Sequence, residues 1–306
     1  MKQYLDVLQK IKDEGVEKSS GRENMPNTIG ISHAVIKMDL QDGFPLLTTK
    51  RMYWKGIIHE LLWILRGDTN IKYLVDNNVN IWNNDAHRWY QQLCKDAGIE
   101  PLELKPFLEK VKNDEHNFGN LGKVYGYQWR NQNGVDQVKD VYESLTTNPF
   151  SRYHIIDAWN KAEFKDMALP PCHLLYQFIV RPTDENTDGC QLYLDLNMYQ
   201  RSCDTFLGVP FNIASMSLLL KIFAKACGMF EGVATWIGGD THLYKDHMDA
   251  VDLQLSRTPG ELPTLNITKD LNSFEDIMKL TIDDFELLDY DPQPTIKAEL
   301  FVGKKK

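Results

Sequence analysis

The sequence predicts an α+β protein, and three observations support this fold class. Segments rich in β-branched and aromatic residues, such as 174–181 and 191–200, occur together with segments of helical period. Strands and helices do not alternate regularly, which disfavours a doubly wound parallel sheet. No stretch rich in proline, glycine or serine divides the 306 residues, and no internal repeat is evident. We therefore expect a single domain, 1–306, with a polar surface insertion at about 86–120.

The hydrophobic pattern predicts the elements in order along the chain. Tyr4, Leu5, Leu8 and Ile11 recur at helical spacing before Gly15, a residue typical of helix C-caps. The segment 46–65 also has a helical period and a largely apolar face. Further helices are expected near 86–97, 134–147, 211–227 and 247–255, and strands at 152–160, 174–181, 191–200 and 233–237. The polar residues 184–189 are typical of a hairpin connection.

Composition and charge exclude several classes of protein. Hydrophobic residues make up 42% and aromatic residues 11%, which is enough to form a core and excludes a disordered chain. The net charge of −9 disfavours a protein dedicated to nucleic-acid binding, although a few arginines in one pocket suffice for a small phosphorylated ligand. The five cysteines form no CxxC pattern, so we expect neither a disulfide framework nor a zinc site.

The sequence predicts a cytoplasmic protein without a membrane span. The N-terminus has no apolar signal-peptide core, and the longest apolar-leaning stretch, 211–230, contains Lys221 and Lys225. His242 and His247 are five residues apart, which is the wrong spacing for two zinc ligands on one helix face. We therefore expect no metal site.

Two residues stand in patterns that suggest chemistry. Glu60 lies inside an apolar helical run, where a carboxylate needs a partner or a function, and both roles stay open. Cys172 follows Pro170 and Pro171 directly before a predicted strand. A lone cysteine is more often a small core residue than a nucleophile, but two prolines provide a rigid approach. Arg201, if it lies close in space, would stabilise a thiolate by direct charge pairing.

Two later segments carry further polar residues. Asn212 opens an apolar helix, where it acts either as an N-cap or as a reader of an amide edge on a ligand. In 238–244, His242 and Tyr244 are two apart on an extended segment and point to the same side. The glycine pair before them is a weak phosphate signal, and no Walker A or dinucleotide fingerprint is present.

Taken in order, these motifs resemble the thymidylate synthase family, and the resemblance runs almost from end to end. The segments that carry it are 1–5, 40–45, 48–51, 59–63, 66–71, 124–126, 128–130, 158–160, 167–173, 199–204, 208–215, 238–244 and 253–257. Because so many motifs occur in the family's order, the resemblance is highly specific. It implies a large mixed twisted sheet covered by helices, in a homodimer whose sheets pack against each other.

The resemblance also implies the reaction. The family methylates dUMP to dTMP and uses 5,10-methylenetetrahydrofolate as co-substrate, with neither a metal nor a nicotinamide. By this similarity, Cys172 attacks C6 of the uracil, because thiolate addition turns the ring into an enolate that can attack the folate methylene. Glu60 organises water and protons around O4, and Tyr125 assists removal of the C5 proton.

The remaining site residues are carried over from the family in the same way. Arg201 and Asn212 complete the catalytic set, one holding phosphate near the thiolate and the other reading the O4 and N3 edge. The implied dUMP contacts are Arg22, Arg152, Gln200, Arg201, Ser202, Cys203, Asp204, Asn212, and the ribose-binding His242 and Tyr244. The implied folate contacts are Lys50, Trp82, Asp204, Gly208 and Phe211, with Asp204 bonding the pterin and Gly208 giving it room. Arg152 is expected to reach the phosphate site of the partner subunit.

The chain departs from the family at three places. Tyr153 replaces a second arginine, and His154 beside it would point to the other face of a strand. The loop 21–28 keeps Arg22 but lacks the usual glycines and contains Glu23. A final strand is expected at 296–302, and the chain continues beyond it to Lys306.

Three functional hypotheses follow. The first is a thymidylate synthase. The second is a dUMP 5-hydroxymethylase, which adds water in place of hydride to the same methylene intermediate. Trp82 favours the first hypothesis, because water must be kept from the methylene intermediate if hydride is to react with it instead. The third is a non-catalytic nucleotide- or RNA-binding relative, which gives no reason for Cys172, Glu60, Tyr125 and Asp204 to occur together.

Overall fold

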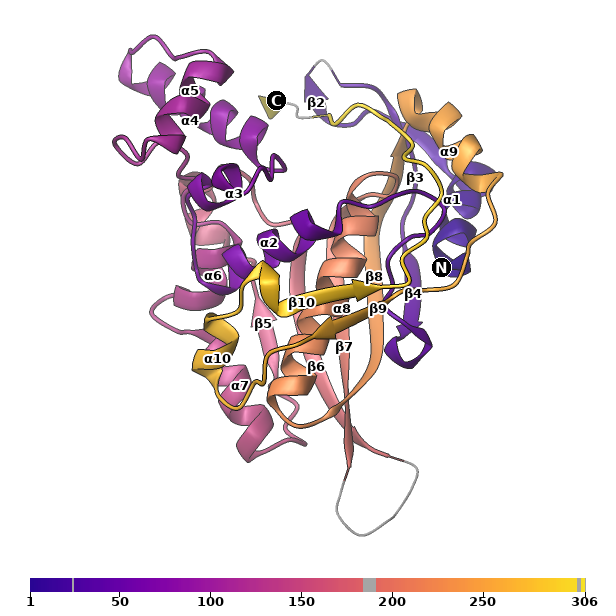
Figure 1. Cartoon of the computed structure of the whole chain (residues 1–306). Helices are drawn as coiled ribbons and strands as arrows, with labels where there is room; N and C mark the ends of the chain where they lie inside the picture. The colour runs from indigo at the N-terminus through magenta and orange to yellow at the C-terminus, as the bar shows by residue number, and fades with distance from the viewer. Residues whose placement is uncertain (24, 184–190, 302–303, 306) are drawn as a thin grey trace.

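A seven-stranded mixed sheet runs through the centre of the computed structural model, which describes residues 1–23, 25–183, 191–301 and 304–305 (Figure 1). The strands are β1 (Val16–Lys18), β3 (Thr28–Ile31), β4 (Ala34–Asp39), β5 (Ile155–Asp157), β6 (His173–Pro182), β7 (Leu192–Asp204) and β8 (Phe230–Tyr244). Their order is β1-β3-β8-β7-β6-β5, and β4 pairs with β8 as well. β7 and β8 are parallel, whereas β6 and β7 are antiparallel. The long strands β7 and β8 thus bring distant parts of the chain together.

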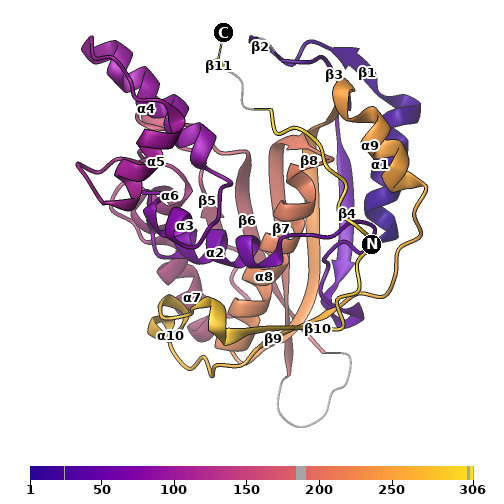
Figure 2. The same cartoon turned by 45° about the horizontal axis from the view of Figure 1, so that its top comes forward.

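Helices surround this sheet, and two short strand pairs lie outside it. The helices are α1 (Lys2–Glu14), α2 (Trp54–Leu65), α3 (Lys72–Asp76), α4 (Asn83–Ala97), α5 (Leu104–Lys112), α6 (Tyr125–Asn131), α7 (Gln137–Thr147), α8 (Gly208–Ala226), α9 (Met248–Leu255) and α10 (Phe274–Met278). The outlying pairs are β9 (Thr264–Ile267) with β10 (Phe285–Leu288), and β2 (Arg22–Glu23) with β11 (Lys304–Lys305). The last pair joins β2 to β11 near the C-terminus, away from the N-terminus of the chain (Figure 2).

The core forms where α8 packs across β7 and β8 (Figures 1 and 2). Leu194, Leu196 and Met198 alternate along β7 and are fully buried, as a strand with one covered face requires. Tyr199 points to the other face and is 41% exposed. Among the described residues, α8 is the one helix long and apolar enough to span a membrane, and 72% of its most apolar window is buried inside the fold.

The structure confirms most of the expected elements. The first helix ends at Glu14, with Gly15 as its C-cap. Helices cover most of 86–97, 134–147, 211–227 and 247–255, and β6 and β7 cover 174–181 and 191–200. The expected connection at 184–189 lies outside the described residues.

Four predicted boundaries are wrong, and long-range contacts explain two of them. The helix expected over 46–65 begins only at Trp54, because the main chain before it bonds to distant segments, as in Gln293 N–H to Thr48 O (2.8 Å). The strand at 233–237 extends over 230–244, because β3 and β4 pair with it in succession. Only 155–157 of 152–160 is strand. Residues 296–301 form no strand, and their Glu299 carbonyl accepts from the His247 side chain instead.

Gly122 allows two backbone segments to approach each other closely. It has φ +74°, and a Cβ there would lie 2.0 Å from Asp166 O. We expect Gly122→Ala to lower the free energy of unfolding by about 3 kcal/mol, from backbone strain and this clash. The midpoint of urea denaturation measures this loss.

Gly134→Ala is the matched control for Gly122→Ala. Gly134 also has a positive φ, +88°, but a Cβ there would have nothing within 4 Å. We expect a loss of only about 1 kcal/mol, from the left-handed backbone alone. Equal losses in the two variants would show that the close approach at Gly122 contributes nothing.

Candidate active site

The segment before β6 presents Cys172 and is held from several sides. The Arg201 guanidinium donates from Nε to Pro171 O (2.7 Å) and from Nη2 to Pro170 O (2.9 Å). The Arg201 main-chain N–H donates to Cys172 O (2.8 Å). Nη2 of Arg201 also lies 4.0 Å from Cys172 Sγ. The proximity that the sequence left open is therefore present, and a guanidinium at this distance favours the thiolate.

Tyr125, the first residue of α6, supports the same cysteine from another element. Its hydroxyl oxygen accepts a hydrogen bond from the Cys172 main-chain N–H (2.6 Å), which leaves its own O–H to donate elsewhere. The Tyr125 ring stacks on His173, with centroids 4.1 Å apart. Burial raises the pKa of Tyr125 well above its ordinary value and lowers the pKa of His173 to about 3. Both side chains are therefore neutral at physiological pH, and the positive charge beside the thiol belongs to Arg201.

Glu60 on α2 has a partner and an unusual proton affinity. The Trp82 indole N–H donates to Glu60 Oε1 (2.8 Å). Burial nevertheless raises the pKa of Glu60 to about 7, and the Trp82 hydrogen bond opposes this rise only in part. The Trp82 ring also meets Tyr125 edge-on, with centroids 6.0 Å apart. A carboxyl with such a pKa can both donate and accept a proton near neutrality, as general acid–base chemistry requires.

Asn212 is oriented by a chain of buried hydrogen bonds. The Trp236 indole N–H donates to Gln200 Oε1 (2.9 Å), and Gln200 Nε2 donates to Asn212 Oδ1 (3.0 Å). This leaves Asn212 Nδ2 as a donor and a second lone pair on Oδ1 as an acceptor, the pattern that reads an amide edge. Leu207, not Asn212, is the N-cap of α8, so the N-cap role considered for Asn212 is wrong.

At the end of β7, Ser202 and Asp204 are half-buried, whereas Cys203 between them points into the core. Asp204 Oδ1 accepts from the main-chain N–H groups of Phe206 (3.2 Å) and Leu207 (3.1 Å), which fixes its carboxylate at the start of α8. Cys203 is fully buried, and burial raises its pKa to about 12. The Cys203 side chain is therefore closed off from a ligand, whereas Ser202 is half-buried.

His242 and Tyr244 lie together at the end of β8, as their spacing predicted. Their ring centroids are 5.6 Å apart, and His242 is paired with Asp204 in the register of the sheet. His242 Nδ1 lies 3.1 Å from Asp240 O and 3.3 Å from Asp240 Oδ1. Because both are acceptors, Nδ1 carries a proton toward Asp240, and Nε2 is the ring nitrogen left to face a ligand. This nitrogen suits a sugar hydroxyl.

Of the residues expected to meet folate, Lys50 and Trp82 are buried, whereas Gly208 and Phe211 are half-buried. Lys50 is buried, and its Nζ donates to Phe206 O (2.6 Å) above the Phe206 ring, which supports the turn after Asp204. Burial lowers the pKa of Lys50 to about 7. At Gly208, a Cβ would lie 3.7 Å from Asp204 Cβ, in ordinary contact. Trp82 is 7% exposed, and Phe211 is half-buried.

Two further arginines expected at the phosphate, Arg22 and Arg152, lie on other elements than Arg201. Arg22 lies on β2, paired with β11. Arg152 is exposed and lies three residues before β5. Tyr153 is 89% exposed, whereas His154 is fully buried with Nε2 3.0 Å from Ser144 Oγ, so the two neighbours do point in opposite directions.

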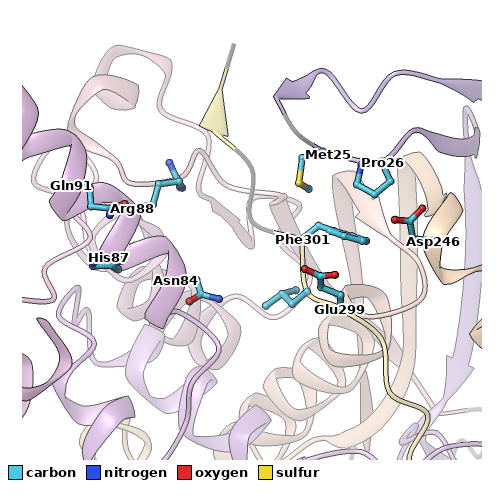
Figure 3. Close-up of a pocket in the computed structure, with 10 residues that line it drawn as sticks. Met25, Pro26, Asn84, His87, Arg88, Gln91, Asp246, Glu299 and Phe301 are labelled. Carbon is cyan, nitrogen blue, oxygen red and sulfur yellow. The ribbon is translucent and has the colours of Figure 1, made fainter. Parts of the chain in front are cut away.

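A cavity of about 740 Å³ opens between α4 and the C-terminal segment (Figure 3). Its lining residues are Met25, Pro26, Asn84, His87, Arg88, Gln91, Asp246, Glu299, Leu300 and Phe301. None of them was named as a site residue from the sequence. His87, Arg88 and Gln91 fall in the expected surface insertion, while Met25 and Pro26 lie in the loop 21–28. The cavity nevertheless borders the site, since the Phe301 ring lies 4.9 Å from that of Tyr244. His173 and Trp236 were also missed as supports of the site.

The site has the features of an acid–base and nucleophile centre. In the described part of the chain, no group of three or more His, Cys, Asp or Glu side chains is arranged to hold a metal ion. The side chains brought together are Cys172, Arg201, Tyr125, Glu60, Trp82, Gln200 and Asn212, with Asp204, His242 and Tyr244 at the ends of β7 and β8.

Comparison with known proteins gives a consistent result. The sequence model of a family described as thymidylate synthase matches residues 2–302. A thymidylate synthase of Mycoplasma pneumoniae is 45% identical over 308 aligned residues, covering 99% of this chain and 100% of that protein. Thymidylate synthases of Malacoplasma penetrans and Mesoplasma florum are 44% and 43% identical, with the same coverage.

The raised pKa of Glu60 predicts a pH-dependent effect of Glu60→Gln on stability. In the unfolded chain this carboxyl ionises near 4.5, whereas in the fold it keeps its proton up to about pH 7. Between these two pH values the folded state binds more protons than the unfolded state, so the free energy of unfolding of the parent chain falls as the pH rises. A glutamine at this position does not titrate, so the variant does not lose this stability. Between pH 5 and pH 8, Glu60→Gln should gain about 2 kcal/mol relative to the parent chain.

Urea denaturation at the two pH values measures this gain. Glu109→Gln, which changes an exposed glutamate on α5, is the matched control. An equal pH-dependent gain in the control variant, or none in Glu60→Gln, would contradict the assignment.

Proposed function

Because the chain belongs to the thymidylate synthase family, we propose that it methylates dUMP to dTMP with 5,10-methylenetetrahydrofolate and that Cys172 is its nucleophile. One observation carries the proposal. The Cys172 thiol lies 4.0 Å from the Arg201 guanidinium, on a segment that also bonds to the Tyr125 hydroxyl. A buried structural cysteine would need neither group. Such a thiol needs a reducing environment, and we include a cytoplasmic location in the proposal.

In the first step, the Cys172 thiolate forms a bond to C6 of the uracil. The electron pair of the C5–C6 bond moves onto C5 and O4, and the resulting enolate attacks the one-carbon unit of the folate. Asn212 Nδ2 is placed to donate to O4, because Gln200 already occupies one lone pair of Asn212 Oδ1. Glu60, in its protonated form, supplies a proton to the water around O4.

In the second step, the C5 proton leaves through the Tyr125 hydroxyl. Because its pKa is far above neutrality, this phenol passes the proton on and does not remain an anion. As the C5 proton leaves, its electron pair forms the exocyclic carbon–carbon double bond and the bond from the one-carbon unit to the folate nitrogen breaks. The folate then supplies the hydride to this methylene carbon. Trp82, which is 7% exposed and bonded to Glu60, covers the reacting carbon from water. With water excluded, hydride reaches the carbon first, and Cys172 then leaves C6 to release dTMP.

The folate side of the site fits a pterin ring. The Asp204 carboxylate is oriented by two main-chain N–H groups, both of which donate to Oδ1, so Oδ2 is placed for the N–H edge of a pterin. Gly208 leaves the surface beside this carboxylate without a side chain. Lys50 supports the fit indirectly, because it holds the Phe206 carbonyl in the same turn.

A homodimer in which the sheets pack against each other is part of the proposal. The sheet face opposite α8 exposes apolar side chains from three strands: Val35 is 50%, Ile179 39% and Tyr199 41% exposed. Burying such a face is the usual role of an obligate interface. The proposal assigns Arg152, which is exposed before the edge strand β5, to the phosphate of a nucleotide in the partner subunit.

Product analysis tests the reaction. The purified protein is incubated with dUMP and 5,10-methylenetetrahydrofolate, and both products are identified by mass spectrometry while absorbance at 340 nm is followed. We expect dTMP and an equal amount of dihydrofolate, and Cys172→Ser should be slower by about 1,000-fold or more. Cys227→Ser is the control, because that thiol is packed beside the core. Hydroxymethyl-dUMP with tetrahydrofolate, or no product, would overturn the proposal.

Subunit mixing tests the role of Arg152. Arg152→Ala and Cys172→Ser chains are each expected to be poorly active alone. In a mixed dimer, one site combines an intact Cys172 with an Arg152 from the other subunit, so random mixing should restore about a quarter of the parent activity. No recovery after verified subunit exchange would show that Arg152 does not act across the interface.

A further inference from the structure

Arg88 on α4 makes a direct contact with the segment that carries Cys172. Its side chain faces the cavity shown in Figure 3 and is 19% exposed. Nη2 of Arg88 donates to Ala168 O (2.9 Å) and to Asp85 Oδ1 (2.8 Å). Asp85 lies one turn earlier on the same helix, so it fixes the direction of the guanidinium. The hydrogen bond to Ala168 is charge-assisted and joins α4 to the nucleophile segment.

The segment 168–172 is stiff, so its first residue influences its last. Pro170 and Pro171 have locked φ angles, and the residue before each proline is restricted as well. At the far end, Arg201 binds both proline carbonyls and Tyr125 accepts from the Cys172 N–H. Few dihedral angles between Ala168 and Cys172 can rotate freely. We therefore expect a displacement of Ala168 to move Cys172 as well.

Arg88 and the Leu121 carbonyl together fix the near end of this segment. The Ala168 N–H donates to Leu121 O (2.9 Å), while the Ala168 carbonyl accepts from Arg88. Both main-chain hydrogen-bonding groups of Ala168 are therefore held, one by the approach to α6 and one by α4. Without Arg88, only one of the two anchors remains.

We propose that Arg88 is a positioning residue for Cys172, acting through the Ala168 carbonyl to keep the thiol beside the Arg201 guanidinium. In this role α4 belongs to the catalytic framework and is more than part of a surface insertion. The proposal deepens the function proposed above, since it names a further residue of the same site. Its first readout does not depend on which reaction the site performs.

The experiment compares Arg88→Met, Arg88→Lys and a control, Gln91→Met. Gln91 lines the same cavity from the same helix, but no hydrogen bond joins it to segment 168–172 among the described residues. Iodoacetamide alkylates Cys172 when the thiolate forms a sulfur–carbon bond and iodide leaves, and peptide mass spectrometry follows this residue alone. In Arg88→Met, we expect the pH midpoint of alkylation to rise by about half a unit as the thiol moves from Arg201.

Turnover of dUMP provides the second readout. We expect kcat of Arg88→Met to fall about tenfold while KM for dUMP stays within about twofold, because the nucleophile and not the binding surface is misplaced. Arg88→Lys should recover part of kcat and part of the shift in the alkylation midpoint, since an ammonium can still donate to Ala168 O. Gln91→Met should behave as the parent chain.

A double variant separates positioning from a simple charge effect. Removing Arg88 leaves Asp85 without its ion pair, and Asp85→Asn combined with Arg88→Met removes that charge as well. Full recovery of kcat and of the alkylation midpoint in the double variant would overturn the proposal, as would parent-like behaviour of Arg88→Met. If the parent chain alkylates normally but does not turn over dUMP, the proposed reaction fails while the alkylation profiles still decide the role of Arg88.

Discussion

The site depends on one side chain, the guanidinium of Arg201. It donates to the carbonyls of Pro170 and Pro171 and lies 4.0 Å from Cys172 Sγ. The same group thus sets the path of the segment and supplies the charge that favours a thiolate. A lysine has no planar fork and cannot bind two successive carbonyls while facing a third atom in this way. The antiparallel register of β6 and β7, with an irregularity directly after His173, places Arg201 beside this segment.

Burial of the side chains around this cation sets their protonation. Burial raises the pKa of Glu60 to about 7 and that of Tyr125 far above its ordinary value, and it lowers that of His173 to about 3. One physical cause therefore produces a carboxyl that exchanges protons near neutrality, a phenol that keeps its proton and an uncharged imidazole. Because His173 is neutral, it does not compete with Arg201 for the thiolate, and the nucleophile and the proton-handling groups can act in turn.

The sequence predicts the local parts of this arrangement better than the long-range parts. Periodicity locates α1, α8, β6 and β7, since each buries one face or is buried throughout. Residues 46–53 were assigned to a helix, because their distant partners, such as the Gln293 N–H, leave no periodic signal. The motifs around Cys172 and Arg201 indicate their chemistry, but only the strand register brings them together. Arg88 gave no signal, because its partner is a main-chain carbonyl of Ala168.

The C-terminal segment shows why a strand was the wrong expectation there. Residues 296–301 are held by aromatic contacts and by one side-chain hydrogen bond, and not by the main-chain hydrogen bonds of a strand pair. Phe301 stacks on His247 with centroids 5.0 Å apart and meets Tyr244 at 4.9 Å, while His247 Nε2 donates to Glu299 O (2.8 Å). Side-chain contacts of this kind fix a segment at a few residues. Between those residues, the path of the main chain depends on the neighbouring side chains. Since Tyr244 also belongs to the proposed ribose site, its ring contact with Phe301 joins that site to the cavity wall.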